Sequence, residues 1–305
     1  MVVEVVNPHI EKKRYTLTCN TDMKKQLDKN KKAKKSLGQH FLTSTSALDQ
    51  IVKAGDITSS DLVVEIGPGK GVLTERLITS AGKVIAIEKD RELIAGLRES
   101  FSRAIDGFRF ELIEGDILDF DTETLRGSKK TISYKVIANI PYYITNAIIR
   151  LFLEATSQPE RMVLLIQKEV ADRIMARDGK ESILSIAVKA YGTPKVVAKV
   201  PPGAFNPPPK VDSAVIVISS ISKKLFQMSA HPNKEGDASI NEKTFFKIVR
   251  AGFAHKRKML AGNLTTLYKK DAIAIVFKKI GMPMKTRAED ITIQDWKKLA
   301  EEFSK

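Results

Sequence analysis

The segment that decides the fold reads Val63-Val64-Glu65-Ile66-Gly67-Pro68-Gly69-Lys70-Gly71. Its apolar start predicts a buried strand, and its glycines let the backbone turn sharply and approach a ligand closely. A dinucleotide site would show the spacing G-x-G-x-x-G, whereas this turn shows G-x-G-x-G behind an acidic residue. The difference favours S-adenosylmethionine, which has no phosphate, and makes Glu65, Gly67 and Gly69 candidate cofactor-binding residues. A tight turn with a purely structural role is the alternative for this motif on its own.

The region around this segment alternates short apolar runs with amphipathic stretches, which is typical of a parallel sheet covered by helices. We predict seven strands, at residues 62–66, 83–88, 109–113, 135–138, 161–166, 195–200 and 213–219. Helices are predicted at 46–54, 72–80, 91–102, 145–154, 168–176 and 182–191, with a C-terminal group at 243–253, 270–280 and 293–303. The predicted fold class is therefore α/β, with a Rossmann-like seven-stranded sheet of the class I methyltransferase type, helices on both faces and a small C-terminal helical domain.

The net charge of +15 is concentrated at the two ends of the chain. Residues 1–36 carry 10 basic and 4 acidic residues, residues 37–220 carry 23 of each, and residues 221–305 carry 18 and 9. Basic ends suit a polyanionic partner, because phosphate neutralisation supplies most non-specific nucleic-acid affinity. Solubility is the alternative explanation. We predict four parts: a flexible basic arm at 1–36, a cofactor-binding domain at 37–222, a linker at 223–242 and a helical domain at 243–305 whose basic residues suit nucleic acid.

The composition disfavours several other classes of protein. No stretch approaches the roughly 18 consecutive apolar residues of a membrane span, and the N-terminus lacks a secretory signal. An organellar transit peptide is disfavoured because the first 36 residues contain one arginine and four acidic residues. Cys19 is the only cysteine, so a disulfide framework and a cysteine-based metal site are excluded. We expect a cytoplasmic protein without a metal site.

Two further acidic residues lie where a cofactor would be held. Glu88 ends the second predicted strand, where a carboxylate can accept hydrogen bonds from both ribose hydroxyls. Asp116 follows the third strand, where its oxygen can accept from an adenine amine. Each could instead cap a helix or carry a solvated loop charge. Because the carboxyl ends of parallel strands meet at one sheet edge, we predict a cofactor site there.

A candidate catalytic motif, Asn139-Ile140-Pro141-Tyr142, directly follows the fourth predicted strand. It resembles the N/D-P-P-Y motif of amino-methyltransferases. An exocyclic amine is a poor nucleophile because its lone pair is delocalised into the ring, so the site must accept its hydrogens and hold the nitrogen in line with the methyl group. We expect the Asn139 side-chain oxygen and the Ile140 carbonyl to accept, and Tyr142 to pack against the base. A plain turn is the alternative.

A proline-rich loop at residues 201–213 contains one aromatic residue, Phe205. Its prolines exclude a helix or an inner strand, and they can hold Phe205 rigidly. A rigid aromatic ring suits a wall for a base that has been removed from its stack. We therefore include Phe205 among the candidate catalytic residues, with ordinary core packing as the alternative.

At these residues the chain resembles the small-subunit ribosomal RNA adenine N6,N6-dimethyltransferases, the kasugamycin-resistance methyltransferase family, and the resemblance extends from Lys34 to Phe303. The opening motif of that family is present at 35–42, its glycine motif at 65–71, its catalytic motif at 139–142 and its aromatic loop at 205–213. The resemblance implies a cofactor pocket lined by His40, Leu42, Gly67, Glu88, Asp116 and Asn139. Ile140 stands where leucine is more usual, which leaves the carbonyl unchanged. The arm before Lys34 is longer than usual, so its role is open.

The resemblance also implies a reaction and a partner. We expect S-adenosylmethionine-dependent dimethylation of two adjacent adenines in the 3′-terminal hairpin loop of small-subunit ribosomal RNA, coupled to maturation of the subunit. The expected partner is the small ribosomal subunit with its RNA, the expected state is a monomer, and no membrane is involved. The tail, at 250–264 and 287–290, resembles that of the small-subunit enzymes, so the resemblance implies a methyltransferase domain at 37–222 and a helical domain that binds RNA or the ribosome at 243–305. Two alternatives stay open: a large-subunit enzyme of the macrolide-resistance type, and a non-catalytic ribosome-assembly or mitochondrial transcription factor on the same fold.

Overall fold

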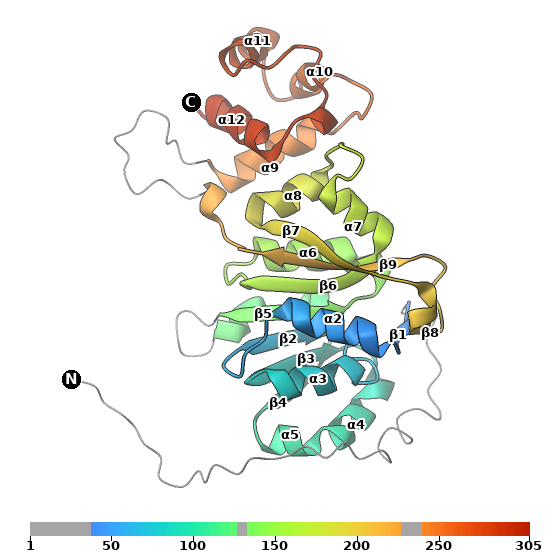
Figure 1. Ribbon diagram of the computed structural model, residues 1–305. Helices are drawn as coiled ribbons and strands as arrows, with labels where there is room; N and C mark the ends of the chain where they lie inside the picture. The colour runs from blue at the N-terminus through green and yellow to red at the C-terminus, as the bar shows by residue number, and fades with distance from the viewer. Residues whose placement is uncertain (1–37, 127–132, 227–239) are drawn as a thin grey trace, which may run out of the picture. The chain divides into compact units, whose positions relative to one another are not determined.

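The structure, a computed structural model, describes residues 38–126, 133–226 and 240–305 (Figure 1). All of them belong to one compact unit, Ala33–Lys305. The predicted arm at 1–36, which includes Cys19, and the larger part of the predicted linker at 223–242 lie outside the described residues. None of the helices in the described ranges combines the length and the hydropathy needed to cross a bilayer.

One seven-stranded sheet forms the centre of the fold, with the strand order β4-β3-β2-β5-β6-β9-β7. The first five of these strands are parallel to one another, whereas β9 is antiparallel to both β6 and β7. The strands are β2 Leu62–Ile66, β3 Lys83–Glu88, β4 Phe110–Glu114, β5 Tyr134–Asn139, β6 Arg161–Gln167, β7 Thr193–Val200 and β9 Ser213–Ser219. Each predicted strand is present in the described chain, and the predicted Rossmann-like α/β class is confirmed.

Helices cover both faces of this sheet. Val63 and Val64 of β2 point to opposite faces of the sheet, because successive side chains of a strand alternate. Both are fully buried, so both faces are covered. Val63 belongs to an apolar cluster with residues of α2 (Thr45–Gly55) and α3 (Val72–Ser80). Val64 belongs to a second cluster, formed with α6 (Thr145–Glu154), α7 (Lys168–Met175) and α8 (Ile183–Tyr191). Figure 1 shows α2 crossing in front of the sheet.

The predicted helix at 91–102 needs correction, because it is divided into α4 (Arg91–Ser100) and α5 (Ser102–Asp106). The break lies at Phe101, where φ is −111° and ψ is 19°. The Phe101 ring packs edge-on against Phe110 of β4, with ring centroids 5.3 Å apart. The helix therefore ends where this aromatic residue turns into the space beside the sheet.

A second, two-stranded sheet joins segments far apart in the sequence and was not predicted. In it β1 (Phe41–Leu42) pairs antiparallel with β8 (Phe205–Asn206), and Leu42 lies opposite Phe205. The backbone N–H of Thr43 extends the pairing by donating to the Ala204 carbonyl at 2.8 Å. Strands of two residues have no alternation pattern, so periodicity cannot reveal them. The pairing brings the opening motif beside the proline-rich loop.

The C-terminal helices pack on α8 through aromatic side chains. They are α9 Glu242–Gly252, α10 Leu260–Leu264, α11 Lys270–Lys279 and α12 Ile293–Phe303, of which α10 was not predicted. The Tyr191 ring stacks on Phe246 with centroids 5.8 Å apart, and its hydroxyl donates to Glu242 at 2.6 Å. Trp296 is fully buried in the apolar cluster that also reaches the sheet. A continuous core thus runs across the predicted domain boundary, and the division at 223–242 stays a prediction.

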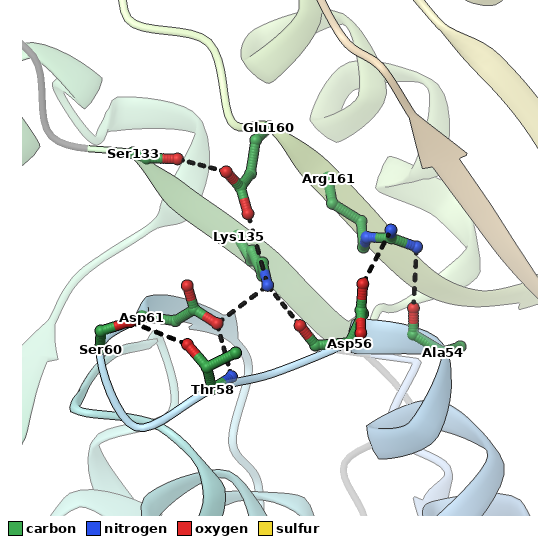
Figure 2. A network of polar contacts seen from close by, with 9 residues as sticks. All are labelled: Ala54, Asp56, Thr58, Ser60, Asp61, Ser133, Lys135, Glu160 and Arg161. Carbon is green, nitrogen blue, oxygen red and sulfur yellow. Dashed lines mark hydrogen bonds and ion pairs between the residues drawn. The ribbon is translucent and has the colours of Figure 1, made fainter.

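A polar network closes the sheet edge at which the parallel strands begin (Figure 2). Lys135 of β5 is buried, and its ammonium donates to the Asp56 backbone carbonyl and to the Asp61 carboxylate, 2.9 Å away. Glu160 lies 3.4 Å from the same ammonium, and Arg161 of β6 pairs with the Asp56 carboxylate. Buried charges need partners. The network therefore fastens the C-terminal end of α2 to β5 and β6.

Candidate cofactor and catalytic site

A cavity opens at the carboxyl ends of β2, β3, β4 and β5, the sheet edge where open α/β folds bind ligands. The loops after these strands supply most of its walls, and the segment before β1 supplies the rest. Of the twelve predicted site residues, nine line this cavity: His40, Gly67, Gly69, Glu88, Asp116, Asn139, Ile140, Pro141 and Tyr142. The other three, Leu42, Glu65 and Phe205, do not line it. The cofactor and catalytic motifs therefore face one shared space.

The glycine turn between β2 and α3 forms one wall of the cavity. Gly67 and Gly69 have φ angles of +63° and +60°, in the left-handed region that favours glycine. A Cβ atom at Gly67 would meet no heavy atom within 4 Å, because the backbone there faces open space. At Gly69 a Cβ atom would lie 3.2 Å from the Phe41 ring. The bare backbone leaves room for a ligand that approaches the turn closely.

Glu88, at the end of β3, holds the glycine turn in place. Its carboxylate accepts hydrogen bonds from the backbone N–H groups of Gly69 at 3.0 Å and Asp90 at 2.8 Å. Burial raises the pKa of Glu88, whereas the two N–H groups lower it. A helix cap was the alternative role for Glu88, but the residue that caps α4 is Asp90, which accepts from the Glu92 N–H.

Glu65 lies behind the turn. Its side chain is buried in β2, and its Oε2 atom has no hydrogen-bond partner among the described residues. Burial raises the pKa of Glu65 to about 8, and the nearby Glu88 carboxylate adds to the rise, while the Thr74 hydroxyl opposes it. The Glu65 carboxyl is therefore protonated at neutral pH.

Asp116 has both the predicted position at the cofactor cavity and the alternative role of a helix cap. It lines the cavity after β4, and it also caps the short helix at Ile117–Asp119 by accepting from the Leu118 N–H at 3.0 Å. Its second oxygen accepts from the Lys89 ammonium at 2.6 Å, and this hydrogen bond lowers the pKa of Asp116. The carboxylate is therefore ionised and held in a fixed orientation at the cavity wall.

Asn139 is the last residue of β5, so the strand delivers its side chain to the cavity. Its amide nitrogen donates to the His40 backbone carbonyl at 3.1 Å. This bond orients the amide, and its oxygen then points away from His40. Ile140, the next residue, has a buried side chain, and Pro141 continues the cavity wall.

Tyr142 is held at both its face and its hydroxyl. The ring stacks on the His40 imidazole with centroids 5.9 Å apart and an interplanar angle of 24°. The hydroxyl shares a 2.6 Å hydrogen bond with the Ser213 hydroxyl at the start of β9. Burial raises the pKa of Tyr142, so the phenol stays neutral. The fixed ring lines the cavity, where it can pack against a ligand.

Phe205 lies in the core, as the packing alternative expects. Its side chain is 4% exposed and belongs to the apolar cluster that also contains Leu42, its partner in the β1–β8 pair. Other residues of the proline-rich loop do reach the site, namely Ser213 through Tyr142 and the Pro207 carbonyl through His40. A role of Phe205 as a wall for an extruded base, and of Leu42 in cofactor binding, stays a prediction.

Eleven residues that line the cavity were not predicted, among them Gln39 and Tyr143, and neither was Ser213, which contacts Tyr142 from outside the lining. Gln39 donates to the Asp90 carboxylate at 2.9 Å and so ties the segment before β1 to the loop after β3. Ser213 fixes Tyr142. Tyr143 lines the cavity and is 63% exposed at its rim. The sequence offered a signal for two of these residues, because Gln39 lies inside the opening motif and Ser213 ends the proline-rich loop.

Known proteins resemble this chain over most of its length. The family described as ribosomal RNA adenine dimethylase matches residues 30–305. Ribosomal RNA small subunit methyltransferase A of Dehalococcoides mccartyi is 42% identical over 276 residues, which cover 90% of this chain and 89% of the relative. A dimethyladenosine transferase structure from Plasmodium falciparum superposes with a TM-score of 0.71 and 28% identity, covering 87% of this chain and 98% of that one. The 23S rRNA methyltransferase ErmE superposes with a TM-score of 0.65 and 25% identity, covering 87% and 100%.

Proposed function

The chain belongs to the ribosomal RNA adenine dimethylase family, and from this we propose that it dimethylates N6 of two adjacent adenines in the 3′-terminal hairpin loop of small-subunit ribosomal RNA. The family and the fold imply S-adenosylmethionine as the methyl donor. One observation carries the proposal: the oriented Asn139 amide and the bare glycine turn face the same cavity. We further propose that the enzyme acts as a monomer in the cytoplasm, on maturing small subunits.

The residues around the cavity fit the cofactor. The open space at Gly67 accommodates a ligand against the backbone, and the Glu88 carboxylate can accept from ribose hydroxyls beside it. Asp116 offers a carboxylate oxygen to the adenine amine across the cavity. When bound, S-adenosylmethionine supplies an activated methyl group on a sulfonium ion. Leu42 and Glu65, which lie outside the lining, would act only through the segments that carry them.

The catalytic turn is proposed to orient the target amine. The Asn139 amide oxygen and the Ile140 carbonyl accept its two hydrogens, which directs the nitrogen lone pair toward the methyl group. Tyr142 packs against the adenine ring and limits its rotation. Because the site preorganises these acceptors, positioning and electrostatics supply the acceleration, and no strong base is needed.

The basic C-terminal part is proposed to hold the RNA backbone. Lys256, Arg257 and Lys258 are exposed between α9 and α10, and they form no ion pair with another described residue. Exposed cations on one loop suit phosphate contacts, which position RNA without reading its sequence. The partner expected from this surface is the small ribosomal subunit.

Two alternative functions agree less well with the site and the relatives. The similarity to a 23S rRNA methyltransferase structure keeps large-subunit RNA in view, but the relative with 42% identity is named for the small subunit. A non-catalytic assembly or transcription factor would not need an intact methylation site, whereas here the glycine turn, the strand-end acids and the catalytic turn are all present. The enzymatic small-subunit role is therefore favoured.

A methyl-transfer assay tests the proposal directly. Purified protein and S-adenosylmethionine with a labelled methyl group are incubated with unmethylated small subunits, or with large-subunit RNA. We expect label in small-subunit adenines as N6,N6-dimethyladenine, and labelling by the Asn139→Ala control that is slower by about a hundredfold to a thousandfold. Label in large-subunit RNA alone would favour the first alternative, and binding without transfer would favour the second.

A further inference from the structure

His40 lies where three separate segments meet. It precedes β1, and it contacts both the catalytic turn after β5 and the loop after β8, which Figure 1 shows beside β1. Three different parts of His40 make these contacts. The backbone carbonyl accepts from Asn139, the ring face stacks on Tyr142, and Nδ1 lies 2.8 Å from the Pro207 carbonyl oxygen.

The contact with Pro207 defines the direction of its hydrogen bond. A carbonyl oxygen only accepts, so His40 Nδ1 must carry the hydrogen and donate it. The imidazole is thus anchored to the proline-rich loop on one edge while its face lies against Tyr142. The His40 side chain therefore contacts the Tyr142 ring and the Pro207 backbone at the same time, and it can set the position of both.

These contacts close a ring of interactions around the proline-rich loop. Pro207 in the middle of the loop is bound to His40, and Ser213 at its end is bound to the Tyr142 hydroxyl. His40 and Tyr142 stack on each other, so residues 207–213 are clamped at both ends to the catalytic turn. The β1–β8 pair is only two residues long, and so short a pairing adds little rigidity alone.

We propose that the His40 imidazole is a positioning residue for base capture: it fixes Tyr142 and the 207–213 loop in the geometry that receives the target adenine. The inference rests on the proposed function, because it assumes that Tyr142 packs against an adenine. The inference assigns different roles to the backbone and to the side chain of His40. The backbone carbonyl orients Asn139 whatever the side chain is, whereas the imidazole acts on the substrate side of the cavity.

Three variants separate the two contacts of the imidazole. His40→Asn keeps an N–H donor at the position of Nδ1 and loses the ring. His40→Phe keeps a flat ring and loses the donor, and His40→Ala loses both. Ser44→Ala is the matched control, because Ser44 lies in the same segment but its hydroxyl caps α2, by accepting from the Ala47 N–H, while its backbone contact with Ala204 survives the substitution.

The measurements are single-turnover methylation of unmethylated small subunits at saturating cofactor, the KM for small subunits, and the Kd for S-adenosylmethionine by calorimetry. Base capture is followed without chemistry on subunits that carry 2-aminopurine, an adenine analogue without the N6 amine, at one target position. We expect His40→Asn and His40→Phe each to lose about threefold to tenfold in rate and capture, and His40→Ala to lose more than either. The Kd for the cofactor should stay within about twofold of wild type, and Ser44→Ala should capture the base normally.

Two results would overturn the inference. One is a His40→Ala enzyme with wild-type rate and capture. The other is a cofactor Kd that weakens in proportion to the rate, since that would make the imidazole a cofactor contact. If His40→Ala fails to fold, the Asn and Phe variants still decide between the roles. A wild-type protein that transfers no methyl group would instead refute the proposed function, and it is measured independently of every variant.

Discussion

Replacing Glu65 with glutamine should remove a large part of the pH dependence of stability. Glu65 is buried, and its pKa is raised from 4.5 to about 8, chiefly by that burial. In the unfolded chain the carboxyl ionises near its ordinary value, so between these two pH values the folded state binds one proton more than the unfolded state. The contribution of Glu65 to the free energy of unfolding is therefore fully present below about pH 4.5, and it is lost progressively as the pH rises toward 8.

The magnitude follows from the proton balance. Each pH unit in this window costs about 1.4 kcal/mol of unfolding free energy, so wild type should lose about 3 kcal/mol between pH 5 and pH 7 through Glu65 alone. Glutamine keeps the size of the side chain and does not titrate. The absolute stability of Glu65→Gln depends on how the buried amide is satisfied, so the slope against pH is the decisive quantity.

Urea unfolding at pH 5, 6 and 7 measures both proteins, with circular dichroism as the probe. Glu114→Gln is the matched control, because Glu114 lies at the same end of a neighbouring part of the sheet, in β4, but is exposed and paired with Arg91. We expect the curves of wild type and Glu65→Gln to diverge by about 3 kcal/mol over this range, and the control to follow wild type. If Glu65→Gln loses stability in parallel with wild type, Glu65 is not a protonated buried carboxyl and the reasoning fails.

The site and the loop at 256–258, which is proposed to bind RNA, give four further predictions. Glu88→Ala should weaken S-adenosylmethionine binding about tenfold to a hundredfold in calorimetry, since a charged hydrogen bond contributes about 1.5 to 3 kcal/mol; an unchanged Kd would remove Glu88 from the cofactor site. Asn139→Ala should slow single-turnover methylation about a hundredfold to a thousandfold with little change in small-subunit affinity, and a near-normal rate would count against its role. Phe205→Ala should lower the unfolding free energy by about 3 to 5 kcal/mol in urea titrations, because the ring is buried; full methylation by Phe205→Leu would assign the ring to packing only. Alanine at all three positions of 256–258 should reduce the log–log salt slope of small-subunit binding by about 2 to 3, whereas an unaltered slope would place the RNA elsewhere.

The central sheet could be predicted from the sequence because five of its strands, β2, β3, β5, β6 and β9, are buried on both faces and appear as continuous apolar runs. The predicted bounds at 62–66 and 83–88 are those observed for β2 and β3. The break at Phe101 could not be predicted in this way, because it depends on packing against Phe110, a residue of a different element. Local periodicity carries no information about such a contact.

The C-terminal part was predicted correctly as helical, yet its relation to the sheet was not visible in the sequence. Its charge suggested a separable RNA-binding domain. In the structure Tyr191 of α8 packs on Phe246 of α9, so the two parts share apolar surface. Deleting the segment would expose that surface, and charge substitutions at 256–258 are therefore the cleaner test of RNA binding.

Site residues at strand ends were accessible from the sequence, since parallel topology gathers the carboxyl ends of strands at one edge. Glu88, Asp116 and Asn139 all line the cavity for this reason. Residues that act through distant partners were not accessible. The hydrogen bond between Tyr142 and Ser213 joins positions 71 residues apart, and no local pattern announces it.

The pairing of β1 with β8 has a consequence for the order in which the protein is made. Leu42 leaves the ribosome early, but its partner Phe205 is synthesised 163 residues later. At about 5 to 20 residues per second, the opening segment waits roughly 8 to 30 seconds for the strand that completes its sheet. His40 meets Pro207 only after the same interval, and Tyr142 meets Ser213 later still. The segment with the glycine turn is therefore synthesised long before the contacts that are proposed to serve base capture can form. Methylating activity should be one of the last properties to arise during translation.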